Sequence, residues 1–305
     1  MDIRDIRYFK IVAEQGNIGR AAEVLNLSAT ALTKSIRRLE EFVGTKMVQR
    51  TPKGVDLTAA GVALLAHAHK LHVTLEDIRH AAADQGAGRS GHIRAGFASG
   101  ICEFCVTDAF AQLRTESRSI SLNAKALLGR EMVPSLRDGK VDFVVRTSSY
   151  PLPGEFQSEE LFRDDRVVFA GANHPFASCK RVSLAELAKE DWASQEAPNS
   201  WREVCGVFEA HGLPPPQRIL IGSSFDMRLA IMESTRLVSC ASRGTVLRAQ
   251  KRYKIIELPV REFRIERHIG VTYRKDGYRS PAAKRMIEIL KEQGRAITAA
   301  QTRRK

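Results

Sequence analysis

The sequence lacks the features that would place the chain in a membrane or outside the cell. No run of eighteen apolar residues occurs, and Met1-Asp2-Ile3-Arg4-Asp5 is charged from its second residue and leads to no cleavage site. Five cysteines, an odd number in a chain of 305 residues, do not form the pattern of a disulfide framework. We therefore expect a cytoplasmic protein with reduced thiols and no membrane partner.

Motifs of common catalytic and metal sites are also missing. The sequence contains no Gly-x-Ser-x-Gly nucleophile turn and no Walker phosphate loop. Its eight histidines are scattered, and His67, His69 and His72 lack the i, i+4 pair that commonly binds metal on a helix. We expect neither enzymatic activity nor a resident metal or cofactor.

The charge of the chain is close to balanced except in one region. Hydrophobic residues make up 43% and charged residues 27% of a chain long enough for two or three folded domains. The net charge of +13 divides into 13 basic against 10 acidic residues in 1–89, 17 against 19 in 90–242, and 18 against 6 in 243–305. Because most of the excess lies near the C-terminus, DNA binding has to be argued from the N-terminal helices instead.

Three short helices with tight turns are predicted at the N-terminus. The first ends at Gly16, Asn17 can cap the second, and Ser28 can cap the third. The third helix carries one apolar stripe at spacings of four, three and four: Leu32, Ile36, Leu39 and Val43.

The remainder of the third helix is polar and basic, as a recognition helix requires. Such a helix buries one stripe on its scaffold and offers donors and cations to a major groove. An ordinary solvated helix face has a similar pattern, so this helix alone leaves both interpretations open. The candidate DNA-binding residues here are Ser28, Thr30, Thr33, Lys34, Arg37 and Arg38.

A short hairpin with basic ends is predicted after the third helix. Lys46 and Arg50 precede a Pro-Gly turn at 51–55, which also contains Lys53. We expect a wing whose three cations contact the phosphate backbone. Such contacts would position the head without reading a sequence, and the wing favours the helix-turn-helix interpretation.

A long helix is predicted from Thr58 to the glycine-rich segment at 85–88. Its apolar residues follow strict four-three spacing: Leu64, Ala68, Leu71, Leu75, Ile78 and Ala82. The stripe could pack on its own domain, but the helix leads directly into a linker, so we favour pairing between two chains as a homodimer. Two paired heads would match the half-sites of an interrupted palindrome.

Alternating strands and helices are predicted from residue 90 onward. The strands are expected at 92–97, 119–124, 141–145, 166–170 and 269–273. The helices are expected at 103–113, 131–137 and 281–292. This order predicts a mostly parallel sheet in two α/β lobes.

Motifs in the first 61 residues are specific to one family. They are Met1-Asp2-Ile3-Arg4, Tyr8-Phe9, Ala21-Ala22-Glu23-Val24-Leu25, Ser28, Ala31-Leu32-Thr33-Lys34-Ser35-Ile36, Leu39-Glu40, Gly44, Arg50-Thr51, Leu57-Thr58 and Gly61. Weaker matches lie at 136–142, 174–175 and 208–214. With these motifs the chain resembles the LysR-type transcriptional regulators over nearly its full length.

The resemblance implies an N-terminal all-α winged helix-turn-helix at 1–58, a linker helix at 59–89 and an α/β effector-binding domain at 90–305. That domain would consist of two Rossmann-like lobes similar to periplasmic binding proteins, lobe I at about 90–162 and 268–300 and lobe II at about 163–267. The implied function is sequence-specific operator binding modulated by a small-molecule co-inducer. The implied partners are double-stranded DNA, the effector, further copies of the chain up to a homotetramer, and RNA polymerase.

Three departures from the family pattern limit what the resemblance predicts. Ala29-Thr30 stands in place of the usual Gln-Pro, which removes an amide that commonly reads a base. Met47-Val48 replaces a Leu-Phe pair, a conservative core change. The segment 235–237 and Ser242 replace a Gly-x-Gly turn and a proline in lobe II. The operator sequence and the effector contacts of lobe II therefore do not transfer from relatives.

Candidate effector residues follow the predicted strands, because ligands of open α/β sheets bind beyond the carboxyl ends of the strands. Ser99 and Gly100 follow the first strand and open a helix, and Arg146 and Thr147 end the third strand. Helix amides and a guanidinium would suit an organic acid. The alternative, which we favour slightly less, is that Ser99 is a helix cap and that Arg146 forms an ordinary ion pair with Asp142 or Glu131.

The other effector candidates rest on the family resemblance. In lobe II similar regulators place contacts at positions that correspond to Ser200, Trp201, Ser223 and Phe225. Leu128 stands where a hydroxyl residue often touches a carboxylate. An apolar residue there favours an aromatic or partly apolar effector over a small dicarboxylate.

Two alternative functions remain open at this point. Cys102 and Cys105 lie one helical turn apart at a possible helix N-terminus, which lowers thiol pKa values and would suit a redox-responsive regulator, although five cysteines readily give one such pair by chance. A ligand-independent DNA-binding protein differs only in whether the lobes bind anything. Activation and repression both remain open, although the family more often activates.

Overall fold

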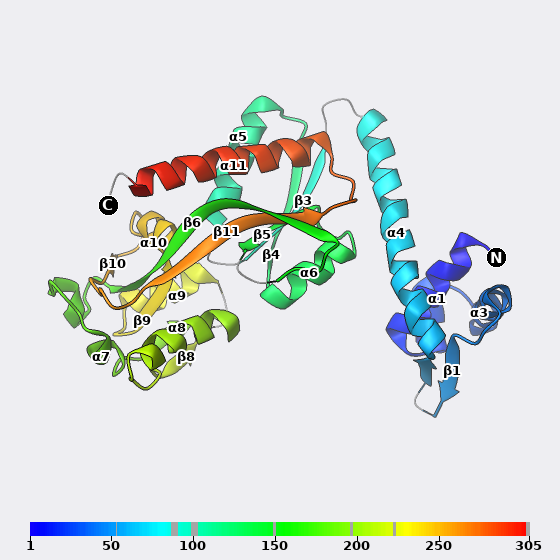
Figure 1. Cartoon of the computed structure of the whole chain (residues 1–305), viewed down its shortest axis with the longest axis horizontal. Coiled ribbons are helices and arrows are strands. Elements are labelled where there is room, and N and C mark those ends of the chain that lie inside the picture. The colour runs from blue at the N-terminus through cyan, green and yellow to red at the C-terminus, as the bar shows by residue number, and fades with distance from the viewer. Residues whose placement is uncertain are drawn as a thin grey trace. The chain divides into compact units, whose positions relative to one another are not determined.

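The computed structural model describes residues 1–52, 54–86, 91–98, 103–148, 151–195, 198–221 and 224–302. They form two compact units, Met1–Ala82 with Arg137–Gly139 and Ala83–Leu136 with Lys140–Lys305 (Figure 1). Within these residues, no helix is both long and apolar enough to cross a membrane. The two units are described separately below.

The first unit contains a three-helix head, a two-stranded wing and most of a long helix. In chain order its elements are α1 (Ile3–Gln15), α2 (Ile18–Leu25), α3 (Ala29–Val43), β1 (Val48–Thr51), β2 (Gly54–Leu57) and α4 (Ala59–Gly86). β1 and β2 pair as an antiparallel hairpin. The predicted all-α head with a wing is confirmed.

Signals in the sequence explain where the helices of the head begin and end. The side chains of Asn17 and Ser28 each accept a backbone N–H of the following first turn at 3.1 Å, as predicted. Gly16 and Gly44 end α1 and α3 with positive φ values of 58° and 78°, a region that glycine enters without steric cost. The short turns leave the helices close enough to share one core.

That core is built from the apolar stripes of all the elements of the head. Its largest fully buried members are Phe9 of α1, Leu32 and Leu39 of α3, and Met47 just before the wing. The first turns of α4 also contribute to it, through Ala68 and, at its margin, Leu64. Burial of this stripe turns the opposite face of α3 outward.

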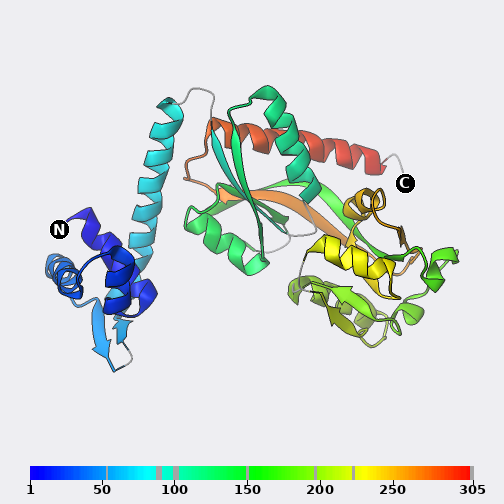
Figure 2. The ribbon, with the colours of Figure 1, turned by 180° about the vertical axis from the view of Figure 1, so that it is seen from behind.

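The second unit is an α/β domain built on one sheet (Figure 2). Its strands are β3 (His92–Ala98), β4 (Ser121–Leu127), β5 (Phe143–Thr147), β6 (Phe156–Gly171), β7 (Trp192–Ser194), β8 (Arg218–Leu220), β9 (Val238–Ser242), β10 (Ile255–Glu257) and β11 (Ile265–Arg274). Its α-helices are α5 (Glu103–Glu116), α6 (Gly129–Arg137), α7 (Leu184–Leu187), α8 (Pro198–Ala210), α9 (Phe225–Glu233), α10 (Arg243–Ala249) and α11 (Pro281–Thr302).

The sheet is mixed, so the prediction of a mostly parallel sheet was wrong. Its strand order is β4-β3-β5-β11-β6-β9-β7-β8, with β10 beside β6. The pairs of β3 with β4 and β5, and of β7 with β8 and β9, are parallel, whereas every pair made by β6 or β11 is antiparallel. These two long strands run side by side through the unit and join its two parallel halves (Figure 1).

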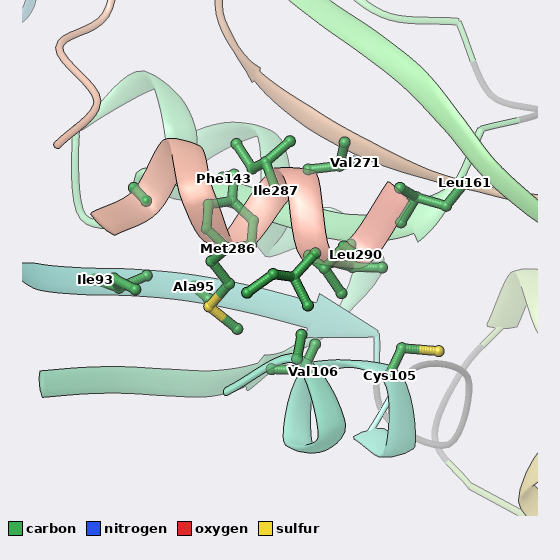
Figure 3. Packing of buried hydrophobic residues seen from close by; sticks show 14 of the residues in the cluster. Ile93, Ala95, Cys105, Val106, Phe143, Leu161, Val271, Met286, Ile287 and Leu290 are labelled. Carbon is green, nitrogen blue, oxygen red and sulfur yellow. The ribbon is translucent and has the colours of Figure 1, made fainter. Parts of the chain in front are cut away.

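We call the half with β3, β4, β5, α5, α6 and α11 lobe I and the half with β7, β8, β9, α7, α8, α9 and α10 lobe II. Lobe I packs α11 and α5 against the strands, with Met286, Ile287 and Leu290 of α11 lying over Ile93 and Ala95 of β3 (Figure 3). Lobe II has its own cores, in which Trp192, Phe208 and Phe169 are fully buried. Among the described residues, β6 and β11 are the strands that run from one lobe to the other.

Candidate nucleic-acid interface and effector site

The outward face of α3 carries most of the predicted base-reading residues. Thr30, Lys34 and Arg37 are exposed, opposite the buried stripe that includes Leu32. The Arg37 guanidinium pairs with Glu41 one turn later at 3.2 Å, with both side chains more than two-thirds exposed. A pair of this kind is weak enough for a phosphate or a base edge to replace it.

Two other predicted contacts of α3 have local structural roles. Ser28 is the N-cap of the helix, and its hydroxyl accepts the Ala31 N–H. The Thr33 hydroxyl donates to the Ala29 carbonyl at 2.8 Å, which leaves its oxygen lone pairs as the groups that face outward. Thr33 would thus accept hydrogen bonds from a base rather than donate them.

Arg38 is held by a buried carboxylate. Asp5 of α1 is fully buried and accepts Arg38 Nε at 2.9 Å, a second guanidinium N–H, and the Ser35 hydroxyl at 2.6 Å. The hydrogen bond from Arg38 holds the pKa of Asp5 far below its ordinary value against the opposing effect of burial. Arg38 itself is half exposed, so one edge of its guanidinium is available at the surface.

Lys46 is similarly tied to a buried carboxylate. Glu40 of α3 accepts Lys46 Nζ at 2.7 Å and the backbone N–H groups of Met47 and Val48 at 2.9 and 3.3 Å. Burial opposes ionisation of Glu40, but these three donors outweigh it and the pKa is lowered. The carboxylate therefore fastens the first residues of the wing to the recognition helix.

The wing is seated against the turn between α1 and α2. Val55 N–H of β2 donates to the Gly16 carbonyl at 2.8 Å. Gly54 has φ 139°, and a Cβ atom there would overlap the Gly16 carbonyl oxygen. Arg50 lies in β1 opposite Val55, but its side chain and the whole of Lys53 lie outside the described residues.

The predicted dimerisation stripe of α4 is divided between two environments. Leu64 and Ala68 pack on the core of the head, so they are not available to a second chain. Leu71 and Leu75 are half-buried, whereas Ile78 is 60% exposed. The C-terminal part of the stripe is the portion with apolar surface left to pair.

A buried ionic cluster lies in the second unit where β6 and β11 pass between the lobes. Asp164 of β6 accepts Arg267 Nη2 of β11 at 2.5 Å and the hydroxyl of Ser242 at the end of β9. All three side chains are almost fully buried. A buried ion pair is costly to break on one side, because the remaining charge is left without a partner.

Arg166 extends this cluster toward α8. Its guanidinium donates to the Ser200 carbonyl at 3.0 Å, to Glu203 at 3.3 Å and to the Cys240 sulfur at 2.6 Å. The side chain is 6% exposed, and its Nε–H has no acceptor among the described residues. The Nε–H of Arg267 likewise has no acceptor among the described residues. We call Asp164, Arg166, Cys240, Ser242 and Arg267 the crossover cluster.

Arginines outnumber aspartates among the most deeply buried of the described side chains in the second unit. Its buried charged side chains, within the part of the chain that the structure describes, are four arginines and two aspartates: Arg146, Arg166, Arg228, Arg267, Asp142 and Asp164. Asp142 is already bound to Arg94 at 2.6 Å. Asp164 and the partly exposed Glu203 pair with the two arginines of the crossover cluster, so an anion would be stabilised there through the two Nε–H groups that have no acceptor among the described residues.

The sequence-predicted effector residues of lobe I divide between the two faces of the sheet. Thr147 lies opposite Ile269 and Arg146 opposite Gly270, so their side chains point to opposite faces. Thr147 shares the face of Arg267, two residues from Ile269 on the same strand. Leu128 precedes α6 and donates its N–H to Glu131. Ser99 and Gly100 lie outside the described residues.

In lobe II the predicted aromatic residues pack into cores. Trp201 lies 6.4 Å from Trp192, with the Arg218 guanidinium 5.2 Å from its ring centre. Phe225 packs edge-on to Phe169 at 6.3 Å. Ser200 reaches the crossover cluster through its carbonyl, as described above. Ser223 lies outside the described residues.

The cysteine pair considered for redox sensing has one described member. Cys105 is buried in the core of lobe I, and burial raises the pKa of its thiol far above its ordinary value. A raised pKa removes the thiolate that oxidation requires. Cys102 lies outside the described residues. Among the described residues no group of three His, Cys, Asp or Glu side chains could hold a metal ion.

Sequence reasoning missed the charged residues that the fold buries. Asp5 and Glu40 were not identified as anchors of predicted DNA contacts, and Arg166 and Arg267 were not candidates for the effector site. A signal existed for Arg166, because a charge directly before the apolar run at 167–170 of a predicted buried strand requires a partner. No comparable signal singles out Asp5 in an amphipathic helix rich in charges.

Comparison with known proteins gives two family models that together span most of the chain. Residues 3–62 match the bacterial regulatory helix-turn-helix protein model of the lysR family, and residues 86–295 match the LysR substrate binding domain. The uncharacterised HTH-type transcriptional regulator YnfL of Escherichia coli K12 is 27% identical over 293 residues, 93% of this chain and 96% of that protein. OxyR of the same strain, a DNA-binding transcriptional dual regulator, is 25% identical over 285 residues, 90% of each chain. The crystal structure of CbnR, a LysR family transcriptional regulator, matches the fold with a TM-score of 0.64 at 20% identity, over 96% of this chain and 99% of that one.

Proposed function

The chain belongs to the LysR family of bacterial DNA-binding transcriptional regulators, and from that premise we propose that it binds an interrupted palindrome as a homodimer and responds to an organic anion. The DNA-binding part of this proposal rests on one observation above all. The donor-rich face of α3 is exposed while a buried carboxylate of the same helix, Glu40, fastens the wing to it. Helix and wing are thereby presented as one rigid surface.

We assign the contacts by their position on this surface. Thr30, Thr33, Lys34 and Arg37 face outward from α3 and approach base edges in the major groove. Lys46, Arg50 and Lys53 belong to the wing segment and hold the register on the phosphate backbone. Because the Lys46 side chain is largely exposed, its ammonium group can contact a DNA phosphate, either in place of Glu40 or in addition to it.

Pairing of two heads uses the far part of α4. Leu71, Leu75 and Ile78 form the section of the apolar stripe that the head does not cover, and an antiparallel or parallel match between two copies would bury it. From the family we extend the proposal to a homotetramer and to contact with RNA polymerase. Light scattering of the full chain and of Ile78→Glu tests the pairing, with a shift toward monomer expected for the variant.

The effector part of the proposal rests on the crossover cluster. An organic acid with an aromatic or partly apolar body would place its carboxylate against Arg166 and Arg267, whose Nε–H groups still lack acceptors among the described residues. Because β6 and β11 belong to both lobes, a ligand bound there would favour one arrangement of the lobes by its differential affinity. Cys105 is buried with a raised thiol pKa, and we do not assign a redox role to it.

Footprinting of the full chain on its own upstream region tests the operator proposal. A protected, roughly two-fold site is expected, and Lys34→Ala with Arg37→Ala should abolish it while leaving the fold intact. A matched control removes one lysine and one arginine elsewhere, Lys251→Ala with Arg252→Ala in an exposed turn of the second unit. Equal loss of protection in both double variants would show that total charge, not α3, drives binding.

Titration with benzoate tests the effector proposal independently of DNA. Thermal unfolding of the second unit is followed by fluorescence of Trp192 and Trp201, the two tryptophans of the chain. Binding at 100 times the Kd would stabilise the folded state by about 2.7 kcal/mol. No stabilisation by benzoate or by a panel of other monocarboxylates would remove the anion from the proposal.

A further inference from the structure

Asp5 is a fully buried carboxylate directly beneath the recognition helix. Four donors saturate it: Arg38 Nε at 2.9 Å, a second N–H of the same guanidinium, the Ser35 hydroxyl at 2.6 Å and the Asp2 backbone N–H at 2.8 Å. Arg38 comes first among the causes that keep the pKa of Asp5 low, so the carboxylate is ionised throughout the working range of pH. Asp5 and Arg38 together form a fixed, fork-like ion pair.

The geometry of Arg38 leaves part of its guanidinium at the surface. Nε and Nη2 face Asp5, and no bond of Nη1 is found within the described part of the chain. The side chain is 50% exposed although its partner is not exposed at all. One edge of the planar group is therefore clamped, and the other edge points away from the core.

The position of Arg38 on α3 indicates what this free edge meets. At about 100° per residue, Arg38 lies some 40° from Lys34, on the side of the helix that leads toward buried Ser35. It is thus at the flank of the outward face, where a helix lying in a major groove meets the sugar-phosphate backbone rather than base edges. A guanidinium held in this way suits a phosphate contact, because its side chain is already ordered in the folded protein and loses little further conformational entropy on binding.

We propose that Asp5 and Ser35 are positioning residues that hold Arg38 at the flank of α3 for one backbone phosphate of the operator. The proposal rests on the proposed operator binding and adds a division of labour within α3. Lys34 and Arg37 face base edges without a buried anchor, and Arg38 sets the depth and rotation of the helix. The contact is made equally on any DNA sequence.

Two simpler roles for Asp5 predict different results. If Asp5 only cancelled positive charge, Asp5→Asn would tighten DNA binding, because the head would gain one net positive charge. If Asp5 only tied α1 to α3, the variant would unfold more easily but bind DNA normally while folded. Positioning predicts weaker binding despite the added positive charge.

The experiment measures Kd values of the full chain for the footprinted fragment and for a scrambled fragment at several salt concentrations. Arg38→Gln and Asp5→Asn should each weaken binding to both fragments by about tenfold, a loss of one charged hydrogen-bond contact. The salt slope is the steepness with which the logarithm of the binding constant falls with the logarithm of the salt concentration. It should fall by about one in Arg38→Gln and stay unchanged in Asp5→Asn, where the cation remains. Asp2→Asn is the matched control. Asp2 directly precedes α1, the helix that contains Asp5, but its carboxylate pairs with Arg4 and not with Arg38.

A double-variant cycle identifies the coupling. Asp5→Asn should have no further effect on Kd in an Arg38→Gln background. If Asp5→Asn does not fold, Ser35→Ala replaces it, and its smaller loss must likewise vanish in that background. Unchanged or tighter binding by the folded Asp5 or Ser35 variant, or losses that multiply independently of Arg38, would overturn the proposal. Failure of the wild-type chain to protect any DNA would instead refute the proposed function itself.

Discussion

Gly54→Ala is expected to dislodge the wing while leaving the second unit intact. Gly54 has φ 139°, a conformation that alanine adopts only under strain, and an added Cβ would overlap the carbonyl oxygen of Gly16. That oxygen belongs to the backbone and accepts the Val55 N–H at 2.8 Å. The overlap can therefore be relieved only by moving β2 away from the turn between α1 and α2.

The size of the effect follows from these two costs. Backbone strain at such a position is worth about 1–3 kcal/mol, and the broken hydrogen bond about 0.5–1.5 kcal/mol. We expect the free energy of unfolding of the first unit to fall by about 2–4 kcal/mol. Gly44→Ala is the matched control, because Gly44 has φ 78° but open space around its Cβ position, so only the strain of about 1 kcal/mol applies.

Hydrogen exchange of peptides from residues 1–57, read by mass spectrometry, measures this loss in the full chain. Tryptophan fluorescence supplies an internal reference, since both tryptophans belong to the second unit and their unfolding should not change. If the displaced wing also loses two phosphate contacts, the salt slope of DNA binding falls by roughly 1.8. Equal destabilisation by the two alanine variants would refute the steric argument.

Three further predictions concern the second unit. Arg166→Met should abolish stabilisation by benzoate and lower the free energy of unfolding by about 1–3 kcal/mol, because the Ser200 carbonyl and the partly exposed Glu203 lose their donor; a loss above about 3 kcal/mol without benzoate would instead make the arginine structural. Iodoacetamide should label exposed Cys179 well before Cys105, whose pKa burial raises, as read by peptide mass spectrometry of the folded chain; early labelling of Cys105 would contradict its burial. Burial and the hydrogen bond to Glu159 raise the pKa of Tyr273 to about 12, so the stability from its neutral phenol is complete below about pH 10 and is lost as the pH rises toward 12. Tyr273→Phe should flatten that alkaline loss in urea titrations, and an identical pH profile in both proteins would count against it.

The head of the molecule was largely predictable because its signals are local. Asn17 and Ser28 cap the helices that they were expected to cap. The four-three spacing on α3 marks Leu32, Ile36 and Leu39, which are buried, whereas Val43 at the end of the predicted stripe is 41% exposed. Capping and helical periodicity act within one or two turns, so a single sequence contains them. The motifs of the first 61 residues identified the family for the same reason.

The long strands of the second unit were predicted poorly. Only 166–170 was expected as a strand, whereas β6 runs from Phe156 to Gly171, and its first half contains charges such as Glu160 and Arg163. These residues pair with β11, more than 100 positions away, where Glu266 and His268 supply partners. Strand length and antiparallel direction therefore depended on distant partners that no local pattern records.

The candidate sites show the same division. Exposure of Lys34 and Arg37 follows from the helical wheel alone, but the clamp on Arg38 requires Asp5, 33 residues away and on another helix. In the second unit, Arg146 and Thr147 were both expected to contact one ligand. Because they are consecutive residues of a strand, their side chains lie on opposite faces of the sheet, and only a ligand that spans the sheet edge could contact both. The sequence placed Arg146 and Thr147 on one strand, as observed, but not the opposite directions of their side chains.

The packing of α11 against β3 has a consequence for synthesis of the chain. The core of lobe I joins Ile93 and Ala95 to Met286 and Leu290, so that half of the sheet stays uncovered on one side until almost the whole chain has left the ribosome. At about 5–20 residues per second, translation of the intervening segment takes roughly 10–40 s, during which strand edges are open to chaperones. The core of the head, in contrast, is complete by Ala68. A premature stop codon before α11 would therefore release a folded head joined to a second unit whose lobe I core lacks Met286, Ile287 and Leu290.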